Sequence, residues 1–145
     1  MEQKLNEQRA AELAQTVCRW SERQNDILAL ALAGSWARGE PRSDSDLDLI
    51  VLCESPKRYR GLDAKAVFEE RIVKQSFEQY GNLFSHRIHL EDGAEIELGF
   101  AAKAWACVQP LDPGSLQVVS GGFKPLADPA GLLSCFLQAI KKAAF

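Results

Sequence analysis

The residues best suited to chemistry begin where a buried run of small and apolar residues ends, at Gly34-Ser35. Gly34 lets a ligand approach the backbone, and the Ser35 hydroxyl can donate a hydrogen bond. A short helix starting near Ser35 would also direct its free N–H groups at a phosphate. Neither Gly-x-x-x-x-Gly-Lys nor Gly-x-Gly-x-x-Gly occurs, so this is not a Walker loop or a dinucleotide fingerprint. Taken alone, Gly-Ser is also typical of an ordinary turn.

Two acids downstream, Asp46 and Asp48, favour a chemical role for this turn. Their two-residue spacing places both carboxylates on one face of a strand that continues into the apolar run 49–53. Like charges a few ångströms apart repel each other and are costly to desolvate, so they need a cation or hydrogen-bond donors between them. Mg²⁺ prefers carboxylate, water and phosphate oxygens. The two aspartates and a nucleotide held at Gly34-Ser35 would supply that set.

These residues resemble the signature of the DNA polymerase β-type nucleotidyltransferase superfamily, particularly its minimal bacterial members. The matching positions are Gly34-Ser35, Ala37-Arg38-Gly39 and Ser45-Asp46-x-Asp48-Leu49. The family places a third carboxylate on a neighbouring strand between hydrophobic residues. Glu97 stands at such a position, although the family more often has Asp there. Glu95 lies on the same face and could substitute or assist.

The resemblance implies transfer of a nucleoside monophosphate, AMP first, from a nucleoside triphosphate to an acceptor hydroxyl, with release of pyrophosphate. Two Mg²⁺ ions would serve the reaction, and the residues implied as catalytic and metal-binding are Asp46, Asp48 and Glu97. The triphosphate, with ATP the first choice, would be held by Gly34, Ser35, Arg38 and Ser45. For Arg38 two interpretations stay open, because it could neutralise phosphate or pair with an acid.

Two rival functions stay open as well. Larger members of the superfamily carry a further, often helical, domain that binds the acceptor, and its absence here predicts a small open site or a partner protein. The chain is therefore also similar to antitoxin-like nucleotidyltransferase modules that pair with a helical toxin and can adenylylate it. A non-catalytic nucleotide-binding domain is the other rival, which three acids around a phosphate turn disfavour. The acceptor is open between a small molecule, a protein side chain and a nucleic-acid end.

Several elements must position these groups. Helical spacing of apolar residues predicts helices over 3–23 and 63–79, and Asp128-Pro129 predicts the start of a last helix over 129–143. Apolar runs predict strands over 27–33 and 47–53. Two hairpins are expected, one joining 86–90 to 95–100 through a type I′ turn at Asp92-Gly93, and one joining 116–119 to 123–126. Together they predict an α/β (α+β) fold with a mixed β-sheet flanked by helices.

Length and composition agree with one domain over residues 1–145. The 17 basic and 20 acidic residues give a net charge of -3, so a surface for nucleic acid is not expected. No apolar run approaches the ~20 residues of a membrane span, and no secretory signal is visible, which predicts a cytoplasmic protein without a membrane partner. The four cysteines are widely spaced and are expected to be reduced, mostly buried thiols.

Overall fold

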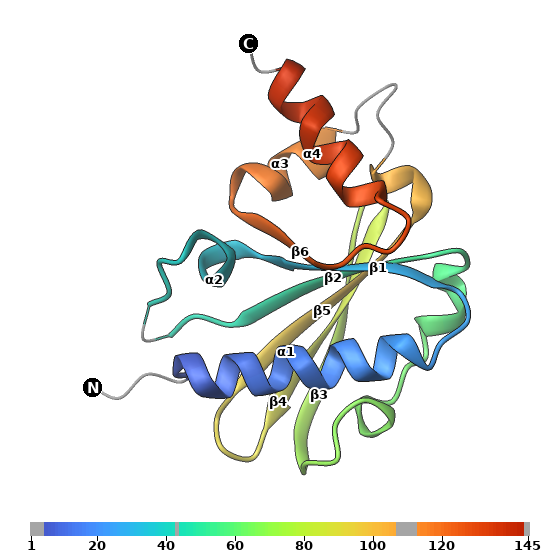
Figure 1. Cartoon of the computed structure of the whole chain (residues 1–145). Coiled ribbons are helices and arrows are strands. Elements are labelled where there is room, and N and C mark those ends of the chain that lie inside the picture. Colours follow the sequence, from blue (N-terminus) through green and yellow to red (C-terminus); the bar gives the residue numbers. More distant parts are fainter. Residues whose placement is uncertain (1–4, 43, 107–112, 144–145) are drawn as a thin grey trace.

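The computed structural model describes residues 5–42, 44–106 and 113–143, and a six-stranded sheet runs through its centre (Figure 1). The strand order is β3-β4-β5-β2-β1-β6. Only β2 and β5 run parallel among these neighbours; the other pairs are antiparallel. The strands are β1 (Ile27–Ala33), β2 (Leu47–Cys53), β3 (Ile72–Tyr80), β4 (Leu83–Leu90), β5 (Glu95–Ala102) and β6 (Phe123–Ala127). The expected mixed sheet flanked by helices is confirmed.

Helices lie on both sides of this sheet, with α1 on one side and α3 and α4 on the other (Figure 1). Their bounds are α1 (Glu7–Glu22), α2 (Gly34–Arg38), α3 (Pro113–Ser120) and α4 (Leu132–Ala143). Short 3-10 turns cover Pro56–Tyr59, Ala64–Ala66 and Lys103–Ala106. No helix within the described ranges is long and apolar enough to cross a membrane.

The alternation of side chains along the strands divides the interior into two cores. The larger core lies under α1, where Leu13, Val17 and Trp20 pack with inward residues of β2 and β5. The smaller core lies under α4, where Phe136 packs against the small alanines of β1. Asp48 and Glu97 therefore belong to the sheet face that carries the smaller core. The parallel register of β2 and β5 places them directly side by side.

The helix expected over 63–79 is wrong. The chain makes only a 3-10 turn at Ala64–Ala66, and β3 then begins at Ile72 and pairs with β4. The apolar spacing was coincidental, because Val67 and Phe68 fill the large core from an irregular segment. The β-branched and aromatic residues of 72–80 favour a strand once β4 is available as a partner.

The small hairpin expected between 116–119 and 123–126 is also wrong. Residues 113–120 form α3, which starts at Pro113, a favoured first helical residue, and ends at the Gly121-Gly122 pair. The strand β6 instead pairs with β1, far away in the sequence. The last helix begins at Leu132, three residues later than 129, and the Asp128 carboxylate accepts N–H groups of its first turn.

The hairpin of β4 and β5 is confirmed, but its turn is not type I′. That turn requires positive φ at both central residues, and Asp92 has none, whereas Gly93 has φ 92°. The Gly93 N–H donates to the Leu90 carbonyl, and the Leu90 N–H donates to the Ala94 carbonyl. The loop is thus the three residues 91–93, which sets the register of β4 against β5.

Among the described cysteines, Cys53 is buried, Cys18 is partly buried and Cys135 is exposed, all three with free thiols. The expectation of mostly buried thiols therefore holds for Cys53 alone. Cys107 lies outside the described residues.

Candidate active site

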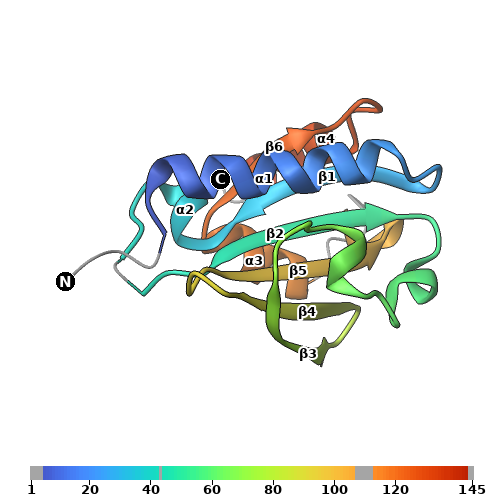
Figure 2. The same cartoon turned by 90° about the horizontal axis from the view of Figure 1, so that it is seen from below.

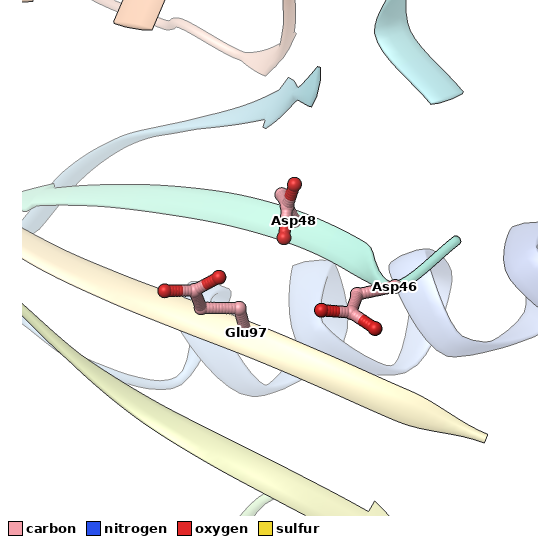
Figure 3. Close-up of side chains that lie close together, drawn as sticks. All are labelled: Asp46, Asp48 and Glu97. Carbon is pink, nitrogen blue, oxygen red and sulfur yellow. The ribbon is translucent and has the colours of Figure 1, made fainter. Parts of the chain in front are cut away.

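Three carboxylates meet at one end of the parallel β2–β5 pair (Figure 3). Asp46 immediately precedes β2, Asp48 lies within it, and Glu97 projects from the neighbouring β5. One carboxylate oxygen from each lies within 4.8 Å of the other two. The structure thus brings together the three acids that the sequence placed in two segments almost fifty positions apart.

The environment of Asp48 makes its negative charge costly. Burial of this carboxyl, together with the negative charges of Glu97 and Asp46, raises its pKa to about 7. Its Oδ1 atom is buried and has no hydrogen-bond partner among the described residues. A group in this state favours binding of a cation or a proton.

Arg87 on β4 supplies a positive charge that the sequence reasoning missed. Its Nη1 atom lies 2.6 Å from Asp46 Oδ2, and its Nη2 atom lies 3.2 Å from Glu97 Oε2. A third carboxylate, Glu95, lies 3.5 Å from Nη1. Arg87 thus contacts two of the three clustered acids, and the described residues show no ion pair between it and Asp48.

Glu95 and Glu97 share a face of β5 but differ in position. Glu97 pairs in register with Asp48 and belongs to the cluster of three acids. Glu95 lies one step outward, beside Arg87 and His89. Burial, and then the nearness of Glu95, raise the pKa of Asp46, while Arg87 acts in the opposite direction. The geometry therefore favours Glu97 over Glu95 as the third acid.

Ser85 on β4, which the sequence did not reveal as part of the site, fixes the orientation of Glu97. The Ser85 hydroxyl donates to Glu97 Oε1 at 3.1 Å, while Arg87 holds the other carboxylate oxygen. Both β4 side chains point to the same face of the sheet because they are two residues apart. Glu97 is consequently held at both oxygens.

The glycine turn lies directly against the acids. Gly34 follows β1 with φ 70°, and a Cβ at this position would overlap Asp48 Oδ2. Its own N–H donates to the Gly122 carbonyl at 3.1 Å, so this amide already has a protein partner. The absence of a side chain at Gly34 is what allows the turn and Asp48 to approach each other.

Two serines connect the turn to the loop before β2. The Ser35 hydroxyl donates to Ser45 Oγ at 2.9 Å, and Ser45 Oγ accepts the Arg42 N–H at 2.7 Å. The guanidinium of Arg38 donates to the Gly121 carbonyl at the end of α3. Of the two roles left open for Arg38, pairing with an acid is not seen among the described residues.

A cavity of about 730 Å³ opens beside the acids, between the sheet and α3. This is within the usual range for small-molecule sites, roughly 300–1,000 Å³. Gly34, Arg38, Asp48 and Glu97 are among its lining residues. Apolar and polar side chains line the rest, among them Ile50, Leu83, Trp105, Val118, Tyr80, Asn82 and Gln117. Ser35, Ser45 and Asp46 are not part of its lining.

The donors fit a hard divalent cation. Asp48 offers a buried oxygen that has no hydrogen-bond partner in the described part of the chain, and the neighbouring carboxylates supply the oxygen ligands that Mg²⁺ prefers. The space left by the missing side chain at Gly34 lies against the same carboxylate. Asp46, Asp48 and Glu97 are therefore the residues that could hold metal.

Several solved structures are similar to this chain. The aminoglycoside 6-adenyltransferase from Bacillus subtilis is similar with a TM-score of 0.51 and 15% identity, over 70% of this chain and 37% of that protein. The Cid1 poly(U) polymerase is similar over 66% of this chain and 31% of its own length, with a TM-score of 0.46 and 17% identity. The apo form of a CCA-adding enzyme is similar over 92% and 32%, with a TM-score of 0.43 and 12% identity. This chain thus spans about a third of the length of each of these proteins.

The sequence itself identifies the family. No curated protein sequence matches the chain. The family model described as the nucleotidyltransferase domain matches residues 12–95, which is more than half of the chain. The match includes the glycine turn and both aspartates, and it ends two residues before Glu97. The resemblance drawn from the Gly-Ser and Asp-x-Asp motifs is confirmed, and the chain belongs to the nucleotidyltransferase domain family.

Proposed function

We propose that this protein transfers AMP from ATP to an acceptor hydroxyl and releases pyrophosphate, with Mg²⁺ bound at Asp46, Asp48 and Glu97. The observation that carries this proposal is the convergence of the three carboxylates, within 4.8 Å of one another, beside the Gly34 turn and the cavity. Phosphoryl transfer needs positioning and charge neutralisation more than covalent chemistry from the protein. A set of acids for metal next to a turn for phosphate meets both needs.

Each residue has a defined part in the reaction. The oxygen of the acceptor hydroxyl forms a bond to the α-phosphorus while the bond from that phosphorus to the bridging oxygen of pyrophosphate breaks. Glu97 lines the cavity, and its carboxylate would accept the proton of the acceptor. Ser35 and Ser45 would donate hydrogen bonds to the terminal phosphates, and Arg38 would reach them from the wall of the cavity.

Two Mg²⁺ ions, when bound, would neutralise the triphosphate and make the acceptor hydroxyl more acidic. Asp46, Asp48 and Glu97 are the residues that would hold them. Arg87 contacts Asp46 and Glu97 and would compete with metal ions for these two carboxylates.

The acceptor is proposed to be a small molecule or a protein side chain. The cavity is closed on one side by α3 and has an apolar wall that includes Trp105 and Leu83, which suits a compact group carrying a ring. The net charge of -3 gives no general attraction for a nucleic-acid end.

The first test is thermal stability with each of the four nucleoside triphosphates, with and without Mg²⁺. A nucleotide at ~100 times its Kd stabilises the folded state by about 2.7 kcal/mol, which shifts the melting temperature visibly. The proposal predicts a shift that requires Mg²⁺, is largest with ATP, and is lost in Asp46→Asn. Asp44→Asn changes an exposed acid in the same loop and should keep the shift.

Turnover is tested by pyrophosphate release and by transfer of label from the α-phosphate of ATP. No shift with any triphosphate would overturn the proposed function. Nucleotide binding without label transfer, even with a co-purified helical protein present, would instead support a non-catalytic nucleotide-binding domain. Labelling of such a protein would identify an antitoxin-like module.

A further inference from the structure

The edge strand β3 carries large exposed apolar side chains. Within the described ranges, the large hydrophobic residues with high exposure are Val73 at 64%, Phe77 at 41% and Tyr80 at 47%, and all three belong to β3. Figure 2 shows β3 at the lower edge of the sheet, with β4 on one side and no strand on the other. Unpaired backbone groups and exposed apolar side chains together mark a surface that accepts another strand.

The opposite edge of the sheet is built differently. Its strand, β6, has Pro125 at the centre, and proline cannot donate a backbone hydrogen bond to a neighbouring strand. Most residues of β6 are also partly covered. The strand β3 has nine residues and no proline. Of the two edges, only β3 is therefore suited to pairing with a further strand.

The charges on β3 indicate what kind of strand could pair with its free edge. Lys74 and Glu78 lie symmetrically about Ser76, and both point to the face that carries Arg87 and Ser85. Neither has an ion-pair partner among the residues that the structure describes. A single edge lysine commonly prevents strand pairing. A lysine and a glutamate at symmetric positions instead make the strand complementary to a second copy of itself.

We propose that two copies of this chain associate through β3, antiparallel and about a two-fold axis at Ser76, into one continuous sheet. Lys74 of each copy then lies opposite Glu78 of the other, which forms two equivalent ion pairs. On the other face, Phe77 of each copy lies opposite Gln75 and diagonal to Phe77 of the other copy. Diagonal neighbours are roughly 7–8 Å apart, within reach of aromatic rings, so both exposed rings lose contact with water.

The charges also fix the register of this pair. Moving the axis by half a residue would place Lys74 opposite Phe77 and would leave all four charges without a partner. In the proposed register, the interface borders a small recess formed by Ser76, Glu78, Ser85, Arg87 and Glu97. The second copy thus lies beside a recess that Glu97 of the acid cluster helps to line, although the pairing itself does not depend on nucleotide transfer.

Charge reversal tests both the partner and the register. Lys74→Glu places two glutamates opposite each other, and Glu78→Lys places two lysines opposite each other, so each variant should dimerise about tenfold more weakly or worse. The double variant should recover the affinity of the unmodified protein. A mixture of the two single variants should form the heterodimer, because both of its pairs are complementary. Lys65→Glu changes an exposed lysine outside β3 and serves as the matched control.

The measurement is sedimentation over a range of concentrations, with circular dichroism to confirm that each variant is folded. Dimers of the unmodified protein, weakening in both single variants and recovery in the mixture and in the double variant would support the proposal. A monomer at every concentration would overturn it. Single variants that dimerise as tightly as the control would also overturn it, because the interface would then lie elsewhere.

Discussion

Replacing Asp48 by asparagine should make the metal-free protein more stable at alkaline pH while removing its response to Mg²⁺. Burial, Glu97 and Asp46 together raise the pKa of Asp48 from 3.8 to about 7. Each pH unit of such a difference corresponds to about 1.4 kcal/mol, so keeping this carboxylate ionised costs the folded protein as much as about 4 kcal/mol. Asparagine has nearly the same shape and carries no charge, so it avoids this cost.

The direction of the pH dependence follows from the same values. Between about pH 4 and pH 7 the folded protein keeps a proton on Asp48 that the unfolded chain has lost, so stability falls as the pH rises through this window. Above about pH 7 the cost is complete. The advantage of Asp48→Asn should therefore be small near pH 4 to 5 and fully developed near pH 8.

Urea denaturation in the presence of a chelator measures this difference directly, and a parallel series with Mg²⁺ measures the metal response. Mg²⁺ should stabilise the unmodified protein above about pH 7 and leave Asp48→Asn unchanged. Asp44→Asn, which removes an exposed acid, should behave as the unmodified protein in both series. The reasoning fails if Asp48→Asn is no more stable than the unmodified protein near pH 8, or if its advantage is equal at both ends of the window.

Three further substitutions probe the same site. Arg87→Met should lower metal-free stability by about 1–3 kcal/mol and increase the stabilisation by Mg²⁺, because the acids lose their internal cation; equal Mg²⁺ titrations in both proteins would contradict this. Ser35→Ala should weaken Mg²⁺-ATP binding by about 1.5–3 kcal/mol in calorimetry, and an unchanged affinity would remove this hydroxyl from the site. Gly34→Ala should destabilise more than Gly39→Ala in urea, since both have positive φ but only Gly34 lies against Asp48; equal losses would show that the overlap is relieved.

The motif of the site could be predicted from the sequence because its parts are local. Asp46 and Asp48 share a face through the two-residue period of a strand, and Gly34-Ser35 ends an apolar run whose length suits a buried strand better than a helix. The structure places these residues together with Glu97 at one end of β2 and β5. Local periodicity therefore gave the shared face of Asp46 and Asp48, whereas the family resemblance supplied Glu97.

Arg87 was missed because of a shift of one residue in the hairpin. A type I′ turn at Asp92-Gly93 would place Arg87 opposite Leu98, on the face away from the acids. The actual three-residue loop pairs Leu90 with Ala94 and so places Arg87 opposite Glu97. A one-residue change in register exchanges the two faces of a strand, and the turn type alone determines which occurs.

The cavity depends on partners distant in the sequence and could not be predicted. One wall of the cavity is α3. The apolar pair Val118-Val119 favoured a strand in the sequence, whereas the structure has a helix that starts at Pro113 and ends before Gly121-Gly122. The segment that forms β3 was predicted as part of a helix, because apolar residues that include Val67 and Phe68 recur at helical spacing. In both cases tertiary contacts decided between the periods of helix and strand.

The parallel pairing of β2 with β5 also has a consequence for folding kinetics. These two strands are separated in the sequence by β3 and β4, so their contact closes a long loop, and such contacts are slow to form. Asp48 and Glu97 become neighbours only when that contact is made. A cation bound between them would therefore stabilise the completed protein and not the states before it, so Mg²⁺ should slow unfolding while leaving the folding rate nearly unchanged.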